Sequence, residues 1–230
     1  MYIARILYPV EVLGPGKRIG IWFAGCHHHC KGCSNPELWE QPEKYRVSAD
    51  TVMTLVNSIA EQHQVDGFTL TGGDPMEQAD ELPPLLERLS KISNDILMYT
   101  GFCWDEICDR KDVLQYVSVL IDGPYQEENN HGQKLIGSSN QTIYYLNPDI
   151  KGRYVRFLND GESRIQNFTS VDGIVSVGIH RVGYEKALDE SIKAQGLKNA
   201  TNQYPPLELI MTLNKQIELQ QIEIKASIIY

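Results

Sequence analysis

Three closely spaced cysteine thiols near the N-terminus are the residues of this sequence best suited to chemistry. Cys26, Cys30 and Cys33 follow one another at the spacing C-x3-C-x2-C. Thiolates this close together can bind one metal ion or one iron–sulfur cluster. Because a closed four-iron cluster normally takes four cysteines, three would leave one iron free for a ligand that is not protein. An open coordination position is typical of a reactive site rather than a structural one.

Structural zinc is the competing interpretation of the same three thiols. His27, His28 and His29 lie between the first two cysteines and could provide a fourth ligand. The spacing alone does not separate zinc from a cluster. The usual zinc knuckle, however, combines C-x2-C with a second such pair downstream, and this sequence has no second pair. The motif T-G-G-D-P at Thr71–Pro75 fits a cluster and has no meaning for zinc.

The bulk composition is that of an ordinary globular protein. The 230 residues allow one large domain or one domain with an appendage, and 42% are hydrophobic. No apolar run approaches the roughly 18–20 residues that span a bilayer, and the N-terminus lacks a signal peptide, so we expect a cytoplasmic protein with no membrane partner. The net charge of −9 and the absence of a Lys/Arg stripe argue against nucleic-acid binding. Five clustered cysteines suit a reducing compartment.

The cysteines follow the first of several short apolar runs. Ile19–Ala24 has the length and composition of a buried strand, so the thiols would lie on the loop at its C-terminal end. Strands and helices then alternate, which predicts βαβ units, a parallel sheet and loops that converge on one face of a barrel or partial barrel. The expected strands are Gly67–Leu70, Ile96–Tyr99 and Val117–Ile121, and the expected helices are Ser48–His63, Asp80–Ile92 and Trp104–Tyr116.

The alternation ends after Leu146, and the rest of the chain has a different pattern. We therefore predict an α/β partial barrel over residues 1–148 and an α+β extension over residues 149–230. Within the extension the patterns predict strands at Arg153–Leu158 and Gly173–Ile179, a turn at Ser170–Gly173, a helix at Tyr184–Ala194 and a linker at Asn199–Pro206.

A glycine-rich motif, Thr71–Pro75, follows the second expected strand. Its two glycines let a ligand approach the backbone closely and leave N–H and C=O groups free to bind polar groups. Alone, such a sequence is most often a plain turn. Its interest comes from its position, one βα unit after the cysteine loop and on the same strand-end face.

Together the two motifs resemble the radical S-adenosylmethionine (SAM) enzymes, and within them the activating proteins of anaerobic, class III ribonucleotide reductases. Leu13–Arg18 is similar to that family's N-terminal G-P-G-x-R, and Gly25–Cys33 is similar to its G-C-x-x-x-C-x-G-C. Tyr99–Phe102, Val119–Gly123 and Gly137–Gln141 match later family segments in order. The resemblance runs from about residue 8 to residue 146.

The resemblance implies a radical SAM partial barrel with two cofactors. Cys26, Cys30 and Cys33 would ligate a [4Fe–4S] cluster, and the amino and carboxylate groups of SAM would chelate the fourth iron. The residues expected to contact SAM are Gly72, Gly73 and Asp74 at the methionine end, Gly32, Cys33 and Ser34 near the adenine, and, more weakly indicated, Thr100, Asp122 and Ser138 toward the ribose or carboxylate.

The same resemblance implies the reaction and the partners. An external one-electron donor, flavodoxin-like or ferredoxin-like, would reduce the cluster, which would cleave SAM to methionine and a 5′-deoxyadenosyl radical. In the resembled family this radical abstracts hydrogen from a backbone glycine of a partner enzyme, which becomes a glycyl radical. Two alternatives stay open: a radical SAM enzyme with another substrate, such as a peptide, and a non-catalytic zinc-binding module.

The remaining features have plainer interpretations. His27–His29 are expected to face solvent or a partner, and His180 to be a satisfied histidine of the core or surface. Cys103 and Cys108 cannot hold a cluster unaided and are expected to be small buried side chains on one helix. The residues after Leu146 contain no further cysteine cluster, so they would complete the barrel, cover its open side or recognise a different partner.

Overall fold

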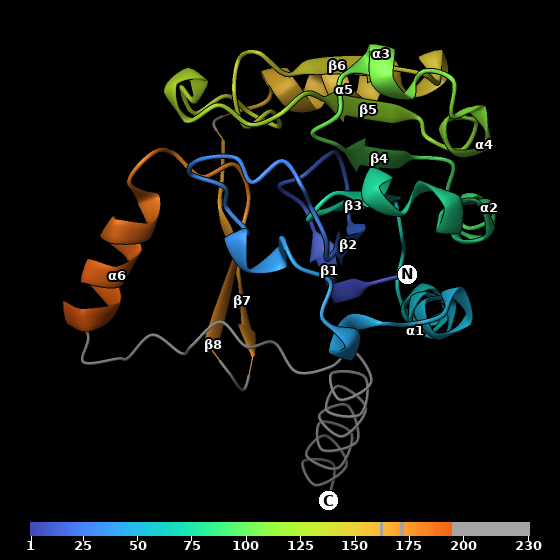
Figure 1. The fold of residues 1–230 in the computed structure, drawn as a ribbon, viewed down its shortest axis with the longest axis horizontal. Helices are drawn as coiled ribbons and strands as arrows, with labels where there is room; N and C mark the ends of the chain where they lie inside the picture. The colour runs from blue at the N-terminus through green and yellow to red at the C-terminus, as the bar shows by residue number, and fades with distance from the viewer. Residues whose placement is uncertain (162, 171–172, 195–230) are drawn as a thin grey trace, which may run out of the picture.

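The fold is built on one six-stranded sheet, in the computed structural model that describes residues 1–161, 163–170 and 173–194. Its strands are adjacent in the order of the chain (Figure 1). The four inner strands are parallel, and an antiparallel strand flanks them at each edge. The strands are β1 (Ile3–Val10), β2 (Arg18–Phe23), β3 (Gly67–Gly72), β4 (Ile96–Tyr99), β5 (Val119–Asp122) and β6 (Thr142–Tyr145).

The predicted α/β class and its parallel strands are confirmed, since β2 to β5 correspond to the four apolar runs of the sequence. The edge strands β1 and β6 were not predicted. In β6 every residue is partly or fully exposed, so its sequence lacks the continuous apolar run that marks the inner strands.

Helices between the strands cover one face of the sheet. α1 (Ala49–Gln62) begins at Ser48, whose side chain accepts a hydrogen bond from the Thr51 N–H at 3.1 Å, as the predicted N-cap requires. The expected helix Asp80–Ile92 is instead a 3-10 segment, η3 (Pro75–Glu81), followed by α2 (Pro83–Ser90). Two successive prolines lack the N–H groups that would continue a helix from η3, so α2 starts at the first of them.

The prediction of a single helix over Trp104–Tyr116 was wrong. The structure has two short helices there, α3 (Trp104–Ile107) and α4 (Lys111–Leu114). Arg110 separates them because its backbone has a ψ of 58°, which is not helical. Cys103 precedes α3 rather than lying inside a helix, and it is exposed, which corrects the expectation that it is buried; Cys108 is partly buried.

The prediction of a strand at Arg153–Leu158 was also wrong, because α5 (Lys151–Asn159) is a helix. Ile150, Tyr154, Phe157 and Leu158 recur at helical spacing, and they pack in one hydrophobic cluster against Leu97, Val119 and Ile121 of the sheet. This cluster lies on the face opposite to α1 and α2, which pack on Ile96, Met98 and Leu120. The domain boundary at residue 148 stays a prediction.

A buried ion pair joins the starts of β2 and β4 to α5. Arg18, the arginine of the G-P-G-K-R motif, is fully buried and lies 3.1 Å from Asp95 Oδ1. Tyr154 of α5 donates its hydroxyl to the same carboxylate oxygen at 2.6 Å. Because Arg18 lies at the opposite end of β2 from the cysteines, this residue of the motif stabilises the fold, whereas Leu13 of the same motif lines the cavity of the cysteines.

The extension contains a separate hairpin, β7 (Gln166–Ser170) with β8 (Gly173–Val177), and then α6 (Tyr184–Ala194). β8 and α6 correspond to the predicted strand at Gly173–Ile179 and the predicted helix. The central residues of the expected turn and the whole expected linker Asn199–Pro206 lie outside the described residues.

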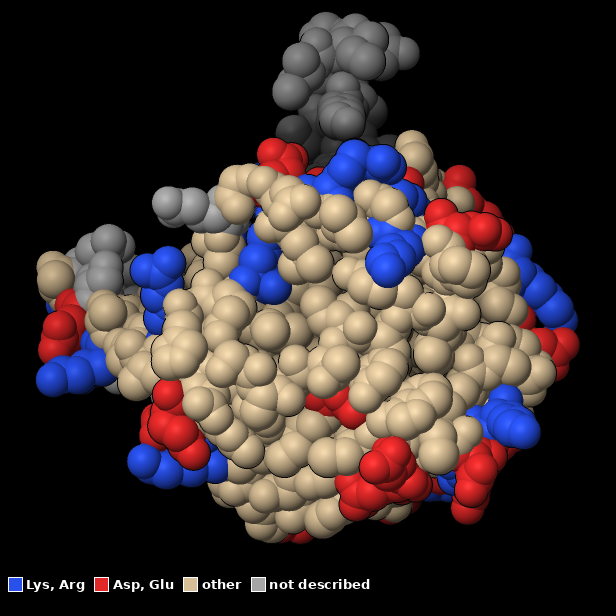
Figure 2. Space-filling view, turned by 90° about the horizontal axis from the view of Figure 1, so that it is seen from above, with Lys and Arg blue, Asp and Glu red and all other residues tan. Residues whose placement is uncertain are grey.

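The surface of the molecule carries charges of both signs. On the face shown in Figure 2, Lys and Arg side chains alternate with Asp and Glu around a largely uncharged centre. Among the described residues, none of the helices has the length and apolar character that a membrane crossing needs.

Candidate functional site

A cavity of about 180 Å³ brings together the two motifs at the C-terminal ends of the parallel strands. It receives residues from the loop after β2, from the end of β3 and from the loop after β4. The predicted site residues that line it are Cys26, Cys30, Cys33, Ser34, Gly72, Gly73, Asp74 and Thr100. Residues separated by more than 70 positions in the sequence therefore share one site, as the strand-end argument predicts.

Backbone hydrogen bonds fix the cysteine loop. The N–H groups of Gly25 and Cys26 donate to the carbonyls of Leu38 and Trp39 at 2.8 and 2.9 Å, and the Cys33 N–H donates to the Cys30 carbonyl at 3.1 Å. Gly32 has a φ of +72°, a left-handed conformation that favours glycine just before the last cysteine. All three thiols are free and partly buried.

The surroundings of the thiols fit sulfur ligands of a metal cluster. Burial raises the pKa of Cys26 to about 11 and raises the pKa values of Cys30 and Cys33. Backbone N–H groups nevertheless point at the sulfurs: those of His28 and His29 at Cys26, that of Tyr125 at Cys30, and that of Asn35 at Cys33, 3.4 Å away. A bound metal deprotonates such thiols, and N–H donors to the sulfurs tune the potential of an iron–sulfur cluster.

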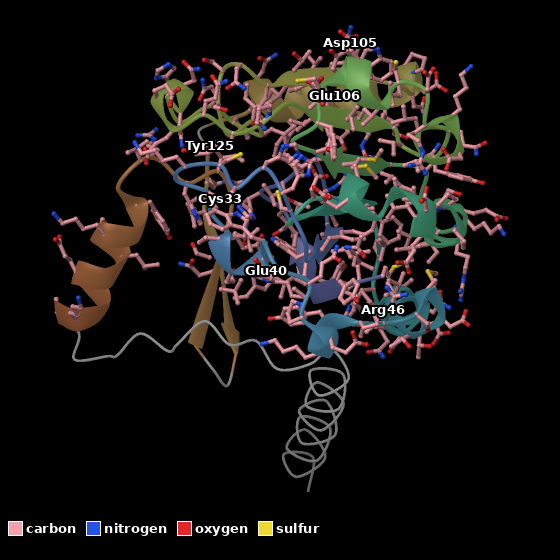
Figure 3. The ribbon with its side chains drawn as sticks, viewed as in Figure 1. Cys33, Glu40, Arg46, Asp105, Glu106 and Tyr125 are labelled. Carbon is pink, nitrogen blue, oxygen red and sulfur yellow. The ribbon has the colours of Figure 1, made fainter. Side chains whose placement is uncertain are left out.

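One of these donors comes from a second strand-end loop. Figure 3 shows Cys33, on the loop after β2, below Tyr125, on the loop after β5. The amide of Tyr125 therefore reaches the cysteine loop from a segment almost 100 residues away in the sequence. Sequence patterns alone gave no sign of this contact.

The glycine-rich turn is bonded directly to the cysteine loop. The Gly73 N–H donates to the Phe23 carbonyl, and the Asp74 N–H donates to the Gly25 carbonyl, each at 2.8 Å. A Cβ atom on Gly73 would lie 2.4 Å from the Gly25 carbonyl oxygen, so only glycine permits this approach. The two motifs therefore form one rigid unit.

Asp74 is buried, and its carboxylate holds the turn in place. One oxygen, Oδ1, accepts a hydrogen bond from the Met76 N–H at 2.9 Å at the start of η3. The other, Oδ2, accepts from Thr100 Oγ1 at 3.0 Å and from the Gly101 N–H at 2.8 Å. Thr100 thus faces Asp74, and the pair joins the loops after β3 and β4.

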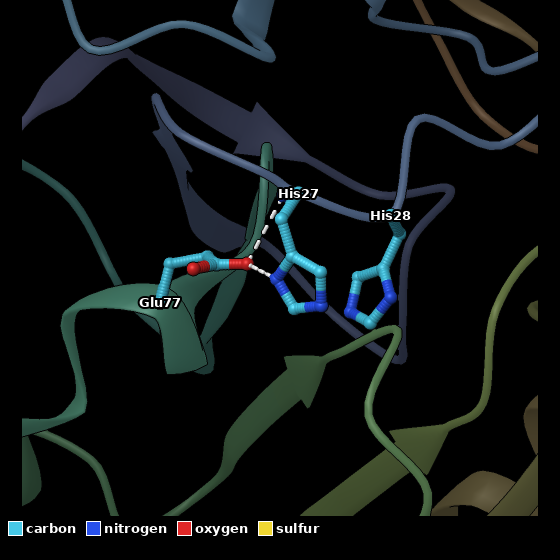
Figure 4. A group of neighbouring side chains, drawn as sticks. All are labelled: His27, His28 and Glu77. Atoms are coloured by element: carbon cyan, nitrogen blue, oxygen red, sulfur yellow. Dashed lines mark hydrogen bonds and ion pairs between the residues drawn. The ribbon is translucent and has the colours of Figure 1, made fainter.

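The three histidines have different surroundings. His27 is exposed and its ring contacts Glu77 (Figure 4). His29 stacks on Trp39 with ring centroids 4.6 Å apart. His28 does not face solvent, which corrects that expectation: its side chain is 14% exposed, and its Nε2 lies 3.3 Å from Asp74 Oδ2, which raises the histidine pKa.

Asp122 and Ser138, two of the weaker candidates, are not among the residues that line the cavity. Asp122 accepts hydrogen bonds from the N–H groups of Trp104 and Thr142 at 2.7 and 3.2 Å, and Ser138 Oγ accepts from the Gln126 N–H at 3.1 Å. Both side chains are buried and stabilise loops behind the site. Gly32 lies at an adjoining hollow that it shares with Cys33 and Ser34.

Sequence reasoning missed part of the cavity wall. β4 contributes its last residue, Tyr99, the loop after β5 contributes Tyr125, and the Gly137–Gln141 segment contributes its two end residues. The extension contributes residues 176–180, which end in His180. The available signal for His180 was its place at the end of the predicted strand Gly173–Ile179, the position that the cysteines and Asp74 occupy on their own strands.

Comparisons with known proteins agree on one family. A family described as "4Fe-4S single cluster domain" matches residues 12–144. Proteins named "Anaerobic ribonucleoside-triphosphate reductase-activating protein" are similar to this chain: those of Vibrio cholerae serotype O1 (32% identical over 146 residues), Enterobacteria phage T4 (34% over 144) and Escherichia coli K12 (30% over 151). The alignments cover 60% of this chain and 94%, 90% and 96% of the three relatives. The chain belongs to the 4Fe-4S single cluster domain family and, within it, to the family of anaerobic ribonucleoside-triphosphate reductase-activating proteins.

Proposed function

We propose that this protein is a radical SAM enzyme that generates a glycyl radical on an anaerobic ribonucleotide reductase. When bound, the [4Fe–4S] cluster and SAM supply the chemistry, namely reductive cleavage of SAM to methionine and a 5′-deoxyadenosyl radical that abstracts hydrogen from the partner's glycine. The family membership and the names of the relatives support this proposal. Their alignments cover nearly the whole of each relative.

One observation of this structure supports the proposal independently of the relatives. Three partly buried thiols and a Gly-Gly-Asp turn, from different strand ends, line the same cavity and are bonded to each other through the backbone. Structural zinc would need a fourth ligand. Of the described cysteines, none beyond these three lines the cavity, and the imidazole of His28, which does line it, has its Nε2 3.3 Å from Asp74 Oδ2. A cluster with an open iron needs no further protein ligand, because SAM provides it.

The residues have distinct proposed roles. Cys26, Cys30 and Cys33 would hold the cluster. Gly72 and Gly73 would offer backbone groups to the methionine end of SAM, in a turn that Asp74 and Thr100 keep in shape. The backbone at Gly32–Ser34 would lie near the adenine, where the missing side chain of Gly32 leaves room.

The same proposal includes the type of barrel, the electron donor, the cellular location and an alternative substrate. The mostly parallel sheet supports a partial (β/α) barrel of the radical SAM type, with residues 1–148 as its main domain. An external one-electron donor of the flavodoxin or ferredoxin kind would reduce the cluster, and the protein would work in the cytoplasm. Because the family match ends at residue 144, a different protein or peptide substrate is the alternative that the extension supports.

Anaerobic reconstitution with iron and sulfide tests the proposal. We expect about four irons per chain, and 5′-deoxyadenosine after addition of SAM and a strong reductant. Incubation with the anaerobic ribonucleotide reductase encoded in the same genome should then give a glycine-centred EPR doublet. About one zinc and no iron would contradict the enzyme assignment, whereas SAM cleavage without the doublet would favour another substrate.

A further inference from the structure

The extension forms one wall of the cavity that holds the three thiols. Five consecutive residues line it: Ser176, Val177, Gly178, Ile179 and His180. They belong to the end of β8 and the segment that follows, beyond residue 144, where the family match ends. In Figure 1 the hairpin (orange) stands beside the loop that follows β2 (blue). This wall is therefore a feature that the chain has in addition to the matched domain.

Packing and hydrogen bonds attach the hairpin to the sheet. Val175 and Val177 are buried in one hydrophobic cluster with Trp22 and Leu38. At the other strand of the hairpin, the Gln166 side chain donates to the Pro9 carbonyl at 2.6 Å and accepts from the Glu11 N–H at 3.0 Å. The hairpin is thus held against β1 and β2 at the end where Gln166 pairs with Val177.

His180 is held in one orientation at the end of this wall. Its ring stacks on Tyr184 with centroids 4.4 Å apart and planes 13° apart, and the Tyr184 hydroxyl is 2.8 Å from Ser176 Oγ. The His180 carbonyl accepts a hydrogen bond from Asn130 Nδ2 at 2.7 Å. Both the ring and the backbone of His180 are therefore fixed before any ligand arrives.

The imidazole of His180 has one buried nitrogen that no described residue pairs with. His180 Nε2 is buried and has no hydrogen-bond partner among the described residues. This corrects the expectation of a satisfied histidine. Burial lowers the pKa of the ring, so its neutral form is favoured. Buried polar atoms of proteins are nearly always hydrogen-bonded, so an orphan nitrogen on a cavity wall indicates a ligand atom opposite it.

The position of His180 indicates which part of the ligand it meets. His180 lines both the main cavity and the adjoining hollow, which it shares with Gly32, Cys33, Ser34 and Tyr125. Gly72, Gly73 and Asp74 line only the main cavity. In the proposed function SAM's methionine lies by the glycine turn and its adenine by Gly32–Ser34. His180 therefore lies at the adenosine half.

We infer that His180 binds the adenosine half of SAM through a hydrogen bond at Nε2, and that the β7–β8 hairpin is an added wall of the SAM site. This inference rests on the proposed function. A neutral imidazole nitrogen can pair with a ribose hydroxyl or with an edge atom of adenine, and Tyr184 behind the ring keeps it in place.

Binding measurements with SAM and with its adenosine and methionine portions test the inference directly. Calorimetric titrations of anaerobically reconstituted full-length protein would use SAM, 5′-deoxyadenosine and L-methionine separately. We expect His180→Ala to raise the Kd for SAM and 5′-deoxyadenosine about 5- to 20-fold and to leave methionine binding unchanged. His180→Gln, whose amide reaches to about the position of Nε2, should recover part of the affinity. His131→Ala, at an exposed histidine outside both hollows, is the matched control.

Each outcome decides something. Unchanged 5′-deoxyadenosine affinity in both His180 variants, with the wild type still cleaving SAM, would overturn the inference and leave the proposed function intact. Equal losses of methionine and 5′-deoxyadenosine binding, or a loss of iron, would show a merely structural role and also overturn it. A wild-type protein that holds four irons but binds neither SAM nor 5′-deoxyadenosine would overturn both proposals. If His180→Ala does not fold, His180→Gln carries the comparison.

Discussion

Asp74 Oδ2 accepts a hydrogen bond from Thr100 Oγ1 at 3.0 Å, and both side chains are buried. The contact joins the ends of two neighbouring parallel strands, β3 and β4, directly behind the glycine turn. A carboxylate with this many protein partners is a structural support, so ligand binding at Gly72 and Gly73 depends on it indirectly.

Thr100→Val should therefore weaken SAM binding by loosening the support behind the glycine turn. Valine keeps the shape of threonine and removes the donor, which leaves Asp74 Oδ2 with fewer partners. We expect a loss of about 1–2 kcal/mol in the free energy of unfolding and a several-fold higher Kd for SAM. Urea denaturation and calorimetry measure the two effects. Thr100→Ser, which keeps the hydroxyl, should behave like the wild type, and equal losses in the two variants would rule out the hydrogen bond as the cause.

The three thiols of the cavity should be required for cluster binding, whereas the two thiols outside it should not. Replacement of Cys30 by Ser is expected to abolish stable cluster binding, because two remaining thiolates cannot hold four irons. Cys108→Ser, a matched control outside the cavity, should retain the iron content and the visible absorption of the wild type. Iron analysis after anaerobic reconstitution checks both. A Cys30 variant with full iron content would mean that another ligand completes the set.

Much of this site could be predicted because its groups follow strand ends. Apolar runs located β2 to β5, and parallel strands place their C-terminal loops on one side, so the cysteines and Asp74 were expected to meet. The histidine at position 180 follows a strand as well, but β8 pairs with β7 in a hairpin that is separate from the six-stranded sheet. Its place on the cavity wall depends on tertiary packing of Val175 and Val177, which no local pattern encodes.

The errors in the predicted fold can be traced to particular residues. The strand predicted at Arg153–Leu158 depended on the apolar residues Tyr154, Phe157 and Leu158. Together with Ile150, these residues have the spacing of one helical face. The helix forms because this face packs against the hydrophobic surface of β4 and β5, which lies far away in the sequence. Asp122 shows the same limit at the site: a strand-end aspartate was expected to contact ligand, but nearby backbone N–H groups take its carboxylate oxygens.

The buried contact between Arg18, Asp95 and Tyr154 should govern stability rather than catalysis. Tyr154→Phe removes one hydrogen bond to Asp95 Oδ1, for which we expect a loss of about 1 kcal/mol in the free energy of unfolding. Arg18→Met removes the fully buried partner of Asp95, which keeps Arg153 at 3.0 Å from its Oδ2, and should cost about 3 kcal/mol. Denaturant titration of both variants checks this order. An Arg18 variant as stable as the wild type would show that the ion pair is dispensable.

The unfolding of the protein without cofactors should depend on pH through His180. Burial lowers the pKa of this histidine in the folded state below the value of about 6.5 that it has in the unfolded chain. The folded state therefore disfavours the charged ring, and the stability that the neutral ring contributes is fully present above pH 6.5 and is lost as the pH falls through the folded-state pKa. The His180 ring stacks on the Tyr184 ring, its carbonyl accepts a hydrogen bond from the Asn130 amide, and the neighbouring Arg181 is exposed. His180→Gln cannot titrate, so its free energy of unfolding should fall less than that of the wild type between pH 7.5 and pH 5.5. Parallel curves for the two proteins in urea titrations across this range would show that His180 is not the group responsible.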